Sequence, residues 1–322
     1  MSTDFEVVVD GIFRQGRHNL SVRLVAENFA PLPAWQPGAH IDVHLRPGLV
    51  RQYSLTGSHR EQQAYHICIA RDAQSRGGSR HVHETLRPGQ RLKISAPRNL
   101  FPLVPAASVT LLAAGIGITP LYAMADALDA AGLPFMLHYY VKQRGDEAFL
   151  PDLSRYVAQG QCKIGYSSEG NSPRGTLPES VLSHVAGRHL YVCGPAGFMQ
   201  QVTQQALAQG WPAEAIHTEA FKPVEAAPVL GADTAFTVTL ARSGRECAVP
   251  AGQTIARALQ DNGIAVTLSC EMGMCGACLT RVTAGEIDHR DTVQSAAEKS
   301  GAEQHIALCC SRSKTPTLVL DL

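Results

Sequence analysis

The chain has 322 residues, of which 45% are hydrophobic and 17% charged, and its 28 Lys and Arg residues balance 28 Asp and Glu residues. This composition is typical of folded globular domains, and a net charge of zero gives no reason to expect nucleic-acid binding. The length predicts two or three domains. The N-terminus lacks a basic patch followed by an apolar run, and glycine and proline interrupt the most apolar segment, 109–124. We therefore expect a cytoplasmic protein with reduced thiols and without signal peptide or membrane span.

Residues 1–105 carry short alternating apolar runs, for example 20–26 and 65–70, separated by turn formers such as Pro37-Gly38 and Pro88-Gly89. Strands of this length and spacing are typical of an antiparallel barrel or sandwich.

Two motifs in this first domain have the chemistry that a flavin requires. Arg51-Gln52-Tyr53-Ser54 offers a guanidinium for a phosphate, a ring to stack on an isoalloxazine and a hydroxyl for a flavin nitrogen. Gly77-Gly78-Ser79 precedes a helix expected over 80–86, whose first N–H groups can bind a phosphate. Each motif alone also fits a structural interpretation, an edge strand or a helix-capping loop. Their order ahead of a dinucleotide-type domain favours a flavin.

Residues 106–224 show continuous apolar runs that alternate with helix-like segments. The runs at 109–114, 135–141, 162–166 and 189–193 read as buried strands. This alternation predicts a parallel, doubly wound α/β sheet, in which ligands bind at the carboxyl ends of the strands.

Three strand ends in this second domain could form a nicotinamide site. Gly115-Ile116-Gly117-Ile118-Thr119-Pro120 opens a helix, and its glycines permit close approach of a pyrophosphate, although a purely structural tight turn stays open. Cys193-Gly194-Pro195 places a thiol where it could face the nicotinamide ring, unless it only packs. Glu169 could accept hydrogen bonds from a ribose diol and favour NADH, while Arg174 leaves NADPH open.

A segment rich in proline, alanine and glycine, 225–234, is expected to link these domains to a third at 235–322. The third domain contains Cys270, Cys275 and Cys278, spaced C-x4-C-x2-C, and a distant fourth cysteine. This is the ligand spacing of a plant-type [2Fe–2S] ferredoxin. Structural zinc usually takes paired short spacings, and a disulfide framework suits a short secreted chain, so both alternatives are weaker.

Cys309 and Cys310 compete for the fourth position. In an extended chain neighbouring side chains point in opposite directions, so one of the two would face the cluster. We expect Cys309 to be that ligand.

The motifs, in this order, resemble the phthalate dioxygenase reductase family, the single-chain reductases of Rieske oxygenases and aromatic O-demethylases. The resemblance implies an FMN-binding antiparallel β-barrel, an NADH-binding α/β domain and an α+β ferredoxin. It also implies that Arg51, Gly77, Gly78 and Ser79 hold the FMN phosphate, that Tyr53 lies along the flavin with Gln52 beside it, and that Ser54 lies near N5. Thr119 and Cys193 would line the nicotinamide path with Gly115, Gly117, Pro120, Gly194 and Pro195. Phe221 would be an aromatic near the flavin, and Cys310 a packed thiol.

The resemblance further implies that electrons pass from NADH through FMN and the cluster to a Rieske oxygenase that docks transiently on the ferredoxin. A diiron or haem oxygenase is an alternative partner. A redox-sensing Fe–S interaction protein is the alternative outside enzymology. The substrate finally oxidised leaves no trace in the sequence.

Overall fold

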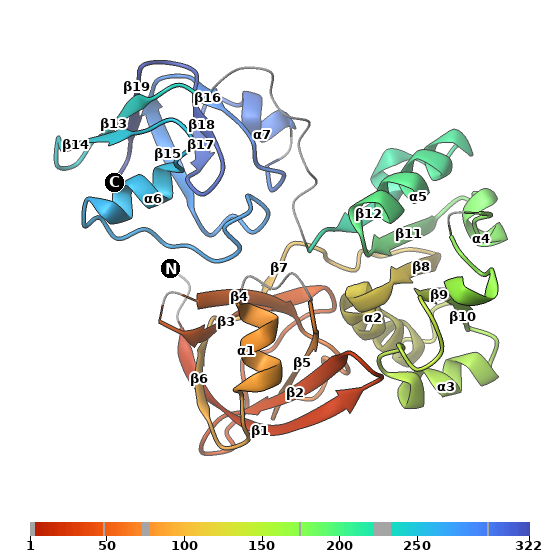
Figure 1. Ribbon diagram of the computed structural model, residues 1–322. Coiled ribbons are helices and arrows are strands. Elements are labelled where there is room, and N and C mark those ends of the chain that lie inside the picture. Colours follow the sequence, from red (N-terminus) through yellow and green to blue (C-terminus); the bar gives the residue numbers. More distant parts are fainter. Residues whose placement is uncertain (1–3, 48, 73–76, 174, 222–232, 295) are drawn as a thin grey trace. The chain divides into compact units, whose positions relative to one another are not determined.

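The computed structural model describes residues 4–47, 49–72, 77–173, 175–221, 233–294 and 296–322 (Figure 1). The chain divides into two compact units, residues 1–221 and 222–322. Most of the predicted linker, 225–232, and Arg174 lie outside the described residues.

The N-terminal part of the first unit is the predicted antiparallel barrel. Its strands pair in the order β4-β3-β6-β1-β2-β5, with β7 paired to β3. The sheet closes on itself because Leu55, just beyond β4, forms a bridge with Ile67 of β5. Alternate residues such as Val7 and Val9 are fully buried inside it, as a barrel requires. The elements are β1 (Phe5–Gln15), β2 (Asn19–Val25), β3 (Ala39–Arg46), β4 (Leu49–Ser54), β5 (Tyr65–Ala70), α1 (Gly78–Glu84), β6 (Arg91–Ile94) and β7 (Arg98–Asn99).

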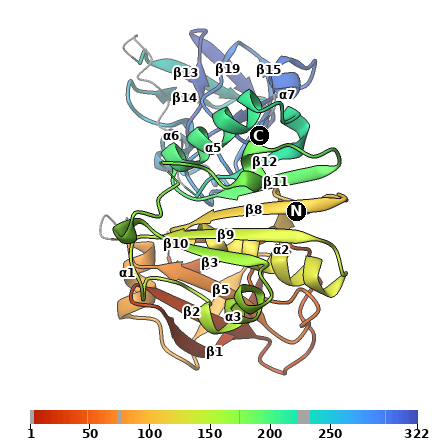
Figure 2. The same cartoon turned by 90° about the vertical axis from the view of Figure 1, so that its right-hand side faces the viewer.

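The remainder of the first unit is the predicted parallel sheet, whose strands lie side by side in Figure 2. Its order is β10-β9-β8-β11-β12, and every pair is parallel. The chain runs outward from β8 to β10 and then returns to β11 on the other side of β8. The carboxyl edge beside β8 and β11 is therefore the topological switch point. The elements are β8 (Ser108–Ala114), η1 (Gly115–Gly117), α2 (Ile118–Ala130), β9 (Phe135–Val141), α3 (Leu150–Ala158), β10 (Cys162–Tyr166), η2 (Ser167–Glu169), α4 (Glu179–Leu182), β11 (Arg188–Cys193), α5 (Ala196–Ala208), η3 (Ala213–Ala215) and β12 (Ile216–Glu219).

Hydrogen bonds join the barrel to the parallel sheet within this unit. The Arg17 amide donates to the Gly145 carbonyl at 2.8 Å, and the Phe149 amide donates to the Gln15 side chain at 2.9 Å. These bonds connect the β1–β2 turn to the loop after β9, so they hold the two sheets in a defined relation.

The second unit has a mixed sheet in the order β14-β13-β19-β15-β17, in which β13 and β19 are parallel. Helix α6 begins at a threonine N-cap, where the Arg257 amide donates to the Thr254 hydroxyl at 3.2 Å. No helix within the described residues is long and apolar enough to cross a membrane. The elements are β13 (Phe236–Leu240), β14 (Glu246–Val249), α6 (Ile255–Asp261), β15 (Leu279–Ala284), β16 (Ile287–Asp288), α7 (Ala296–Ser300), β17 (Gln304–Ala307), β18 (Arg312–Ser313) and β19 (Thr317–Leu320).

Candidate functional site

The two flavin motifs meet in space although 25 residues separate Arg51 from Gly77, the first glycine of the second motif. Arg51 lies on β4, and the glycines lie at the start of α1. A Cβ added to Gly78 would lie 2.7 Å from Cγ of Arg51 and 3.0 Å from its Nε. Only glycine lets the helix start lie against the arginine stem at this distance. Helix α1 begins two residues before the expected start at residue 80, so Gly78 and Ser79 belong to its first turn.

The loop that leads into α1 has donors of the kind that bind a phosphate. Gly77 has a φ of 98°, a left-handed conformation that glycine adopts without strain. A Cβ at Gly77 would lie 3.8 Å from the Arg46 guanidinium, so a second arginine, missed in the sequence, lies near this loop. Ser79 Oγ accepts a hydrogen bond from the Asp72 amide at 3.2 Å, so this hydroxyl also orders the loop.

Buried polar atoms line β3 and β4 at the other end of the motif. Gln52 pairs with Asp42 and Ser54 with His40 across the two strands. Among the described residues, His40 Nε2, Gln52 Nε2 and Arg98 Nε have no hydrogen-bond partner. Burial, aided by Arg98, lowers the pKa of His40 to about 4, so its imidazole is neutral. Unpaired buried polar atoms are costly, and a polar ring system such as the isoalloxazine fits such a cradle.

The Tyr53 ring is held in the barrel wall and packs against its core. Burial raises the pKa of its phenol, so the hydroxyl stays protonated. Ser54 is buried at the end of the strand.

At the parallel sheet, the predicted nicotinamide residues lie at one edge because all five strands end there. Gly115 has a φ of 57° and open space where a Cβ would be. Gly117 has a different role, since a Cβ there would lie 2.2 Å from the carbonyl oxygen of Cys193. It therefore brings the β8 turn against the end of β11, and only Gly115 presents open backbone to a ligand. Thr119 is buried, and its hydroxyl donates to the Ile116 carbonyl at 3.0 Å, which closes the turn.

Sequence reasoning missed Glu219, which ends β12 beside Cys193 in the parallel register. Its Oε2 is buried with no hydrogen-bond partner among the described residues, and burial raises the pKa of the carboxyl to about 8. Burial, followed by the nearby Glu219 charge, also raises the pKa of the Cys193 thiol. Both groups are thus neutral acids near pH 7. Phe221 follows two residues later and packs against the core of the parallel sheet.

Glu169 lies at the carboxyl end of β10, where its carboxylate forms a bidentate pair with Arg144 at 2.6 and 3.0 Å. The Arg144 guanidinium lies 4.4 Å from the centre of the Tyr166 ring. Both charged groups are largely exposed, so the pair contributes little to stability and is available to a ligand.

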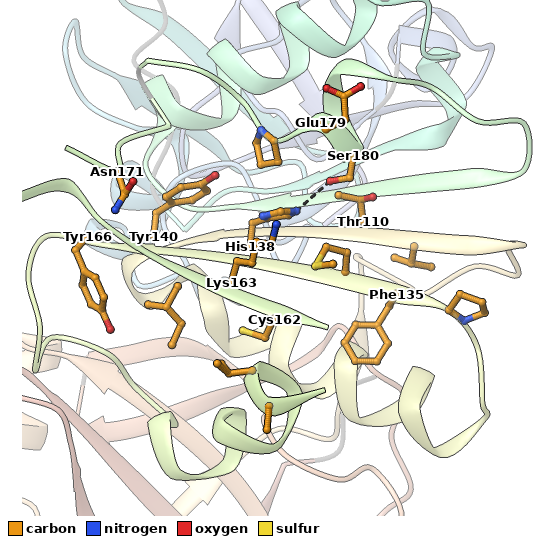
Figure 3. A pocket seen from close by; sticks show the side chains of 18 of the residues that line it. Thr110, Phe135, His138, Tyr140, Cys162, Lys163, Tyr166, Asn171, Glu179 and Ser180 are labelled. Atoms are coloured by element: carbon orange, nitrogen blue, oxygen red, sulfur yellow. Dashed lines mark hydrogen bonds between the residues drawn. The ribbon is translucent and has the colours of Figure 1, made fainter. Parts of the chain in front are cut away.

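A cavity of about 1210 Å³ runs along β9 and β10 toward these residues (Figure 3). His138 and Ser180 both line it and form a hydrogen bond, with Nε2 and Oγ 3.0 Å apart. Burial and the charge of Lys163 lower the pKa of His138 to about 4, so this imidazole is neutral. Tyr140 and Tyr166 line the end of the cavity nearest the carboxyl edge.

In the second unit, the four predicted cluster cysteines are all buried. Their thiols interact in two pairs, Cys270 with Cys275 and Cys278 with Cys309. Amides of the same loop donate to the sulfurs, from Met272 to Cys270 at 3.3 Å, from Gly273 to Cys309 at 3.2 Å and from Ala277 to Cys275 at 3.5 Å. Four buried sulfurs, three of which receive these amide hydrogen bonds, fit a cluster carrying negative charge.

Cys309 and Cys310 do not lie in an extended chain, so the expected conformation of this pair was wrong. Residues 307–310 form a turn, in which the Cys310 amide donates to the Ala307 carbonyl at 3.2 Å. Neighbouring side chains of a turn need not point in opposite directions. The hydrogen bond that the Gly273 amide donates to Cys309 Sγ, and the interaction of this thiol with Cys278, support Cys309 as a ligand.

Known proteins match this chain throughout its length. Residues 238–314 match the 2Fe-2S iron-sulfur cluster binding domain family. The vanillate O-demethylase oxidoreductase of Pseudomonas sp. strain HR199 is 41% identical over 98% of this chain and 99% of its own length. The carnitine monooxygenase reductase subunit of Escherichia coli is 35% identical over 99% of this chain and 98% of its own length. The solved phthalate dioxygenase reductase superposes with a TM-score of 0.75 at 34% identity, over 99% of this chain and 98% of that one.

These matches define a flavin- and pyridine-nucleotide-dependent iron–sulfur reductase. The chain belongs to the phthalate dioxygenase reductase family and is a reductase of an oxygenase system. Its cofactors are FMN, NADH and a [2Fe–2S] cluster, as expected. When bound, the flavin accepts two electrons as a hydride and the cluster passes them on singly.

Proposed function

We propose that this reductase delivers electrons from NADH to a separate Rieske-type aromatic oxygenase, either a ring dioxygenase or an O-demethylase. The observation that carries the proposal is the full-length similarity to vanillate O-demethylase oxidoreductases. A second one, from Acinetobacter baylyi, is 40% identical over 99% of both chains.

We infer the residue roles from the family resemblance, and the geometry above supports some of them. Arg51 binds the FMN phosphate together with the Gly77-Gly78-Ser79 loop, since Gly78 lies directly against the arginine. Tyr53 lies along the flavin and Ser54 near its N5. The buried, unpaired Gln52 amide contributes to the polar wall of the same cradle.

The nicotinamide half of NADH binds at the edge formed by Gly115 and Cys193, with Thr119 and the Gly194-Pro195 turn holding the backbone in place. Gly117 and Pro120 shape the entry to α2. Glu169 binds the adenosine ribose at the end of β10, and the adenine extends toward Tyr166 and the cavity of Figure 3.

The cluster is held by Cys270, Cys275, Cys278 and Cys309. The chain has a flavin domain at residues 1–105, a nucleotide domain at 106–224 and a ferredoxin domain at 235–322. Residues 225–234 link the nucleotide domain to the ferredoxin domain. The ferredoxin docks transiently on the oxygenase in the cytoplasm, because electron-transfer interfaces are small and weak.

The test is reconstitution with purified components. The protein, NADH, a Rieske O-demethylase oxygenase and vanillate should yield the demethylated product, with NADH consumption coupled to product. The matched control is the Cys275→Ser variant, which should reduce its flavin but form no product. NADH oxidation without product, in the presence of a competent oxygenase, would contradict the proposal.

A haem oxygenase is the second candidate partner, because an intact self-sufficient cytochrome P450 monooxygenase superposes with a TM-score of 0.85 at 35% identity. This chain covers only 41% of that protein. Adding a P450 in place of the Rieske oxygenase to the same assay distinguishes the two: faster reduction of the haem iron would favour the P450.

A further inference from the structure

The turn that carries Cys309 brings a fifth cysteine to the cluster loop. The amides of Cys310 and Ser311 both donate to the Ala307 carbonyl, at 3.2 and 3.0 Å. Leu308 and Ser311 on either side are completely or almost completely buried. The flanks of the turn are therefore fixed, and the two cysteines occupy its tip.

Gly273 lies close to the sulfurs of both Cys309 and Cys310. Its amide lies 3.2 Å from Cys309 Sγ, and a Cβ added to it would lie 2.5 Å from Cys310 Sγ. Gly273 also has a φ of 73°, so a larger residue is excluded both by conformation and by the Cys310 sulfur. The Cys309 thiol interacts with those of both Cys278 and Cys310.

The Cys310 sulfur is held only loosely. Apart from the neighbouring Cys309 thiol, its hydrogen-bond partners are the Ala307 carbonyl at 3.9 Å and Ser311 Oγ at 3.8 Å, both long even for sulfur. Cys310 is half-buried, whereas the four other cysteines of this region are buried. A rotation of its side chain would therefore break no short hydrogen bond to oxygen.

We propose that Cys310 is an alternate fourth ligand of the [2Fe–2S] cluster, able to replace Cys309 on the iron that Cys278 also binds. The proposal rests on the ligand set assigned above. In the exchange, the Cys309 Sγ–Fe bond breaks and a Cys310 Sγ–Fe bond forms. The proton of the Cys310 thiol passes to the released Cys309 sulfur, and no electron is gained or lost.

The test compares Cys309→Ala, Cys310→Ala and the double variant in the full-length protein. Iron and acid-labile sulfide are counted, and the dithionite-reduced proteins are compared by electron paramagnetic resonance. Cys310→Ala should keep the wild-type spectrum. Cys309→Ala should keep most of the iron with shifted g-values, and the double variant should hold no cluster. Alanine removes any oxygen that could bind iron in place of sulfur.

A Cys309→Ala protein that stays without a cluster after supply of Fe²⁺ and sulfide, yet matches apo Cys310→Ala by circular dichroism, would overturn the proposal. So would a double variant that retains its cluster. If Cys309→Ala does not fold, the closer isostere Cys309→Ser is compared with Cys309→Ser in the Cys310→Ala background. Identical spectra for that pair would also refute the exchange.

Cys247→Ala added to Cys309→Ala is the matched control, since Cys247 is buried in β14 and outside the cluster loop. It should not change the iron content. Failure of the proposed partner would show separately, as absence of oxygenase turnover by a wild-type protein with its full iron content.

Discussion

The proposed cluster loop and the proposed nicotinamide edge are built from residues that come together in different ways. Three of the four cluster cysteines lie within nine residues of sequence, Cys270 to Cys278, so local spacing alone places them. The proposed nicotinamide edge combines four strand ends, which carry Gly115, Glu169, Cys193 and Glu219. The first site therefore depends on loop geometry and the second on the register and order of a parallel sheet.

The largest effect is expected from a substitution that disrupts the cluster site and leaves the nicotinamide edge intact. Cys275→Ser removes one of four buried sulfurs, so cluster absorbance and NADH-driven cytochrome c reduction should both be lost. Flavin reduction by NADH should remain at the wild-type rate, because β4 and the parallel sheet belong to the other compact unit. Stopped-flow absorbance measures both steps. Loss of flavin reduction in Cys275→Ser, but not in a Cys247→Ala control, would show that the two sites are not separable.

The next effect concerns the backbone of the second site. Gly117→Ala would place a methyl group 2.2 Å from the Cys193 carbonyl oxygen, and overpacking of this kind costs about 1–3 kcal/mol. Gly115→Ala meets open space and costs about 1–2 kcal/mol, from its left-handed conformation alone.

Thermal unfolding and NADH titration separate these two glycines. Gly117→Ala should lower the melting temperature more, while Gly115→Ala should raise KM for NADH more in proportion to its stability loss. The reverse ranking would mean that Gly117, not Gly115, faces the nucleotide.

The sequence predicted the fold of all three parts, because alternation in the barrel, continuous apolar runs in the parallel sheet and the cysteine spacing are each local signals. Sequence reasoning missed features in which residues distant in the sequence come into contact only in the folded structure. Glu219 is one acidic residue on a short strand, and nothing local reveals that its carboxyl is buried beside Cys193. The turn at Cys309 was likewise not predicted from the sequence, because its geometry depends on the packing of the buried residues Leu308 and Ser311.

A pH titration of stability tests the buried carboxyl. Burial raises the pKa of Glu219 from 4.5 to about 8, so the folded state binds an extra proton between these values. The favourable contribution is complete below pH 4.5 and is lost as pH rises through 8, by up to a few kcal/mol at about 1.4 kcal/mol per pKa unit.

Glu219→Gln keeps the shape and neutrality of the group without titrating. Its melting temperature should therefore exceed that of the wild type at pH 8.5 and equal it at pH 5. Equal curves at both pH values would mean that the carboxyl is ionised and solvated.

The smallest expected effect is at the exposed end of the second site. Glu169→Ala breaks a surface pair with Arg144 and should leave the melting temperature unchanged. Because the freed guanidinium can bind a 2′-phosphate, KM should rise for NADH and fall for NADPH. Arg144→Ala is the matched control and should raise KM for NADPH instead. Steady-state rates with both nucleotides give the two KM values. An unchanged ratio of KM for NADH to KM for NADPH in Glu169→Ala would show that Glu169 does not bind the ribose, and would leave the proposed edge at Gly115 and Cys193 unaffected.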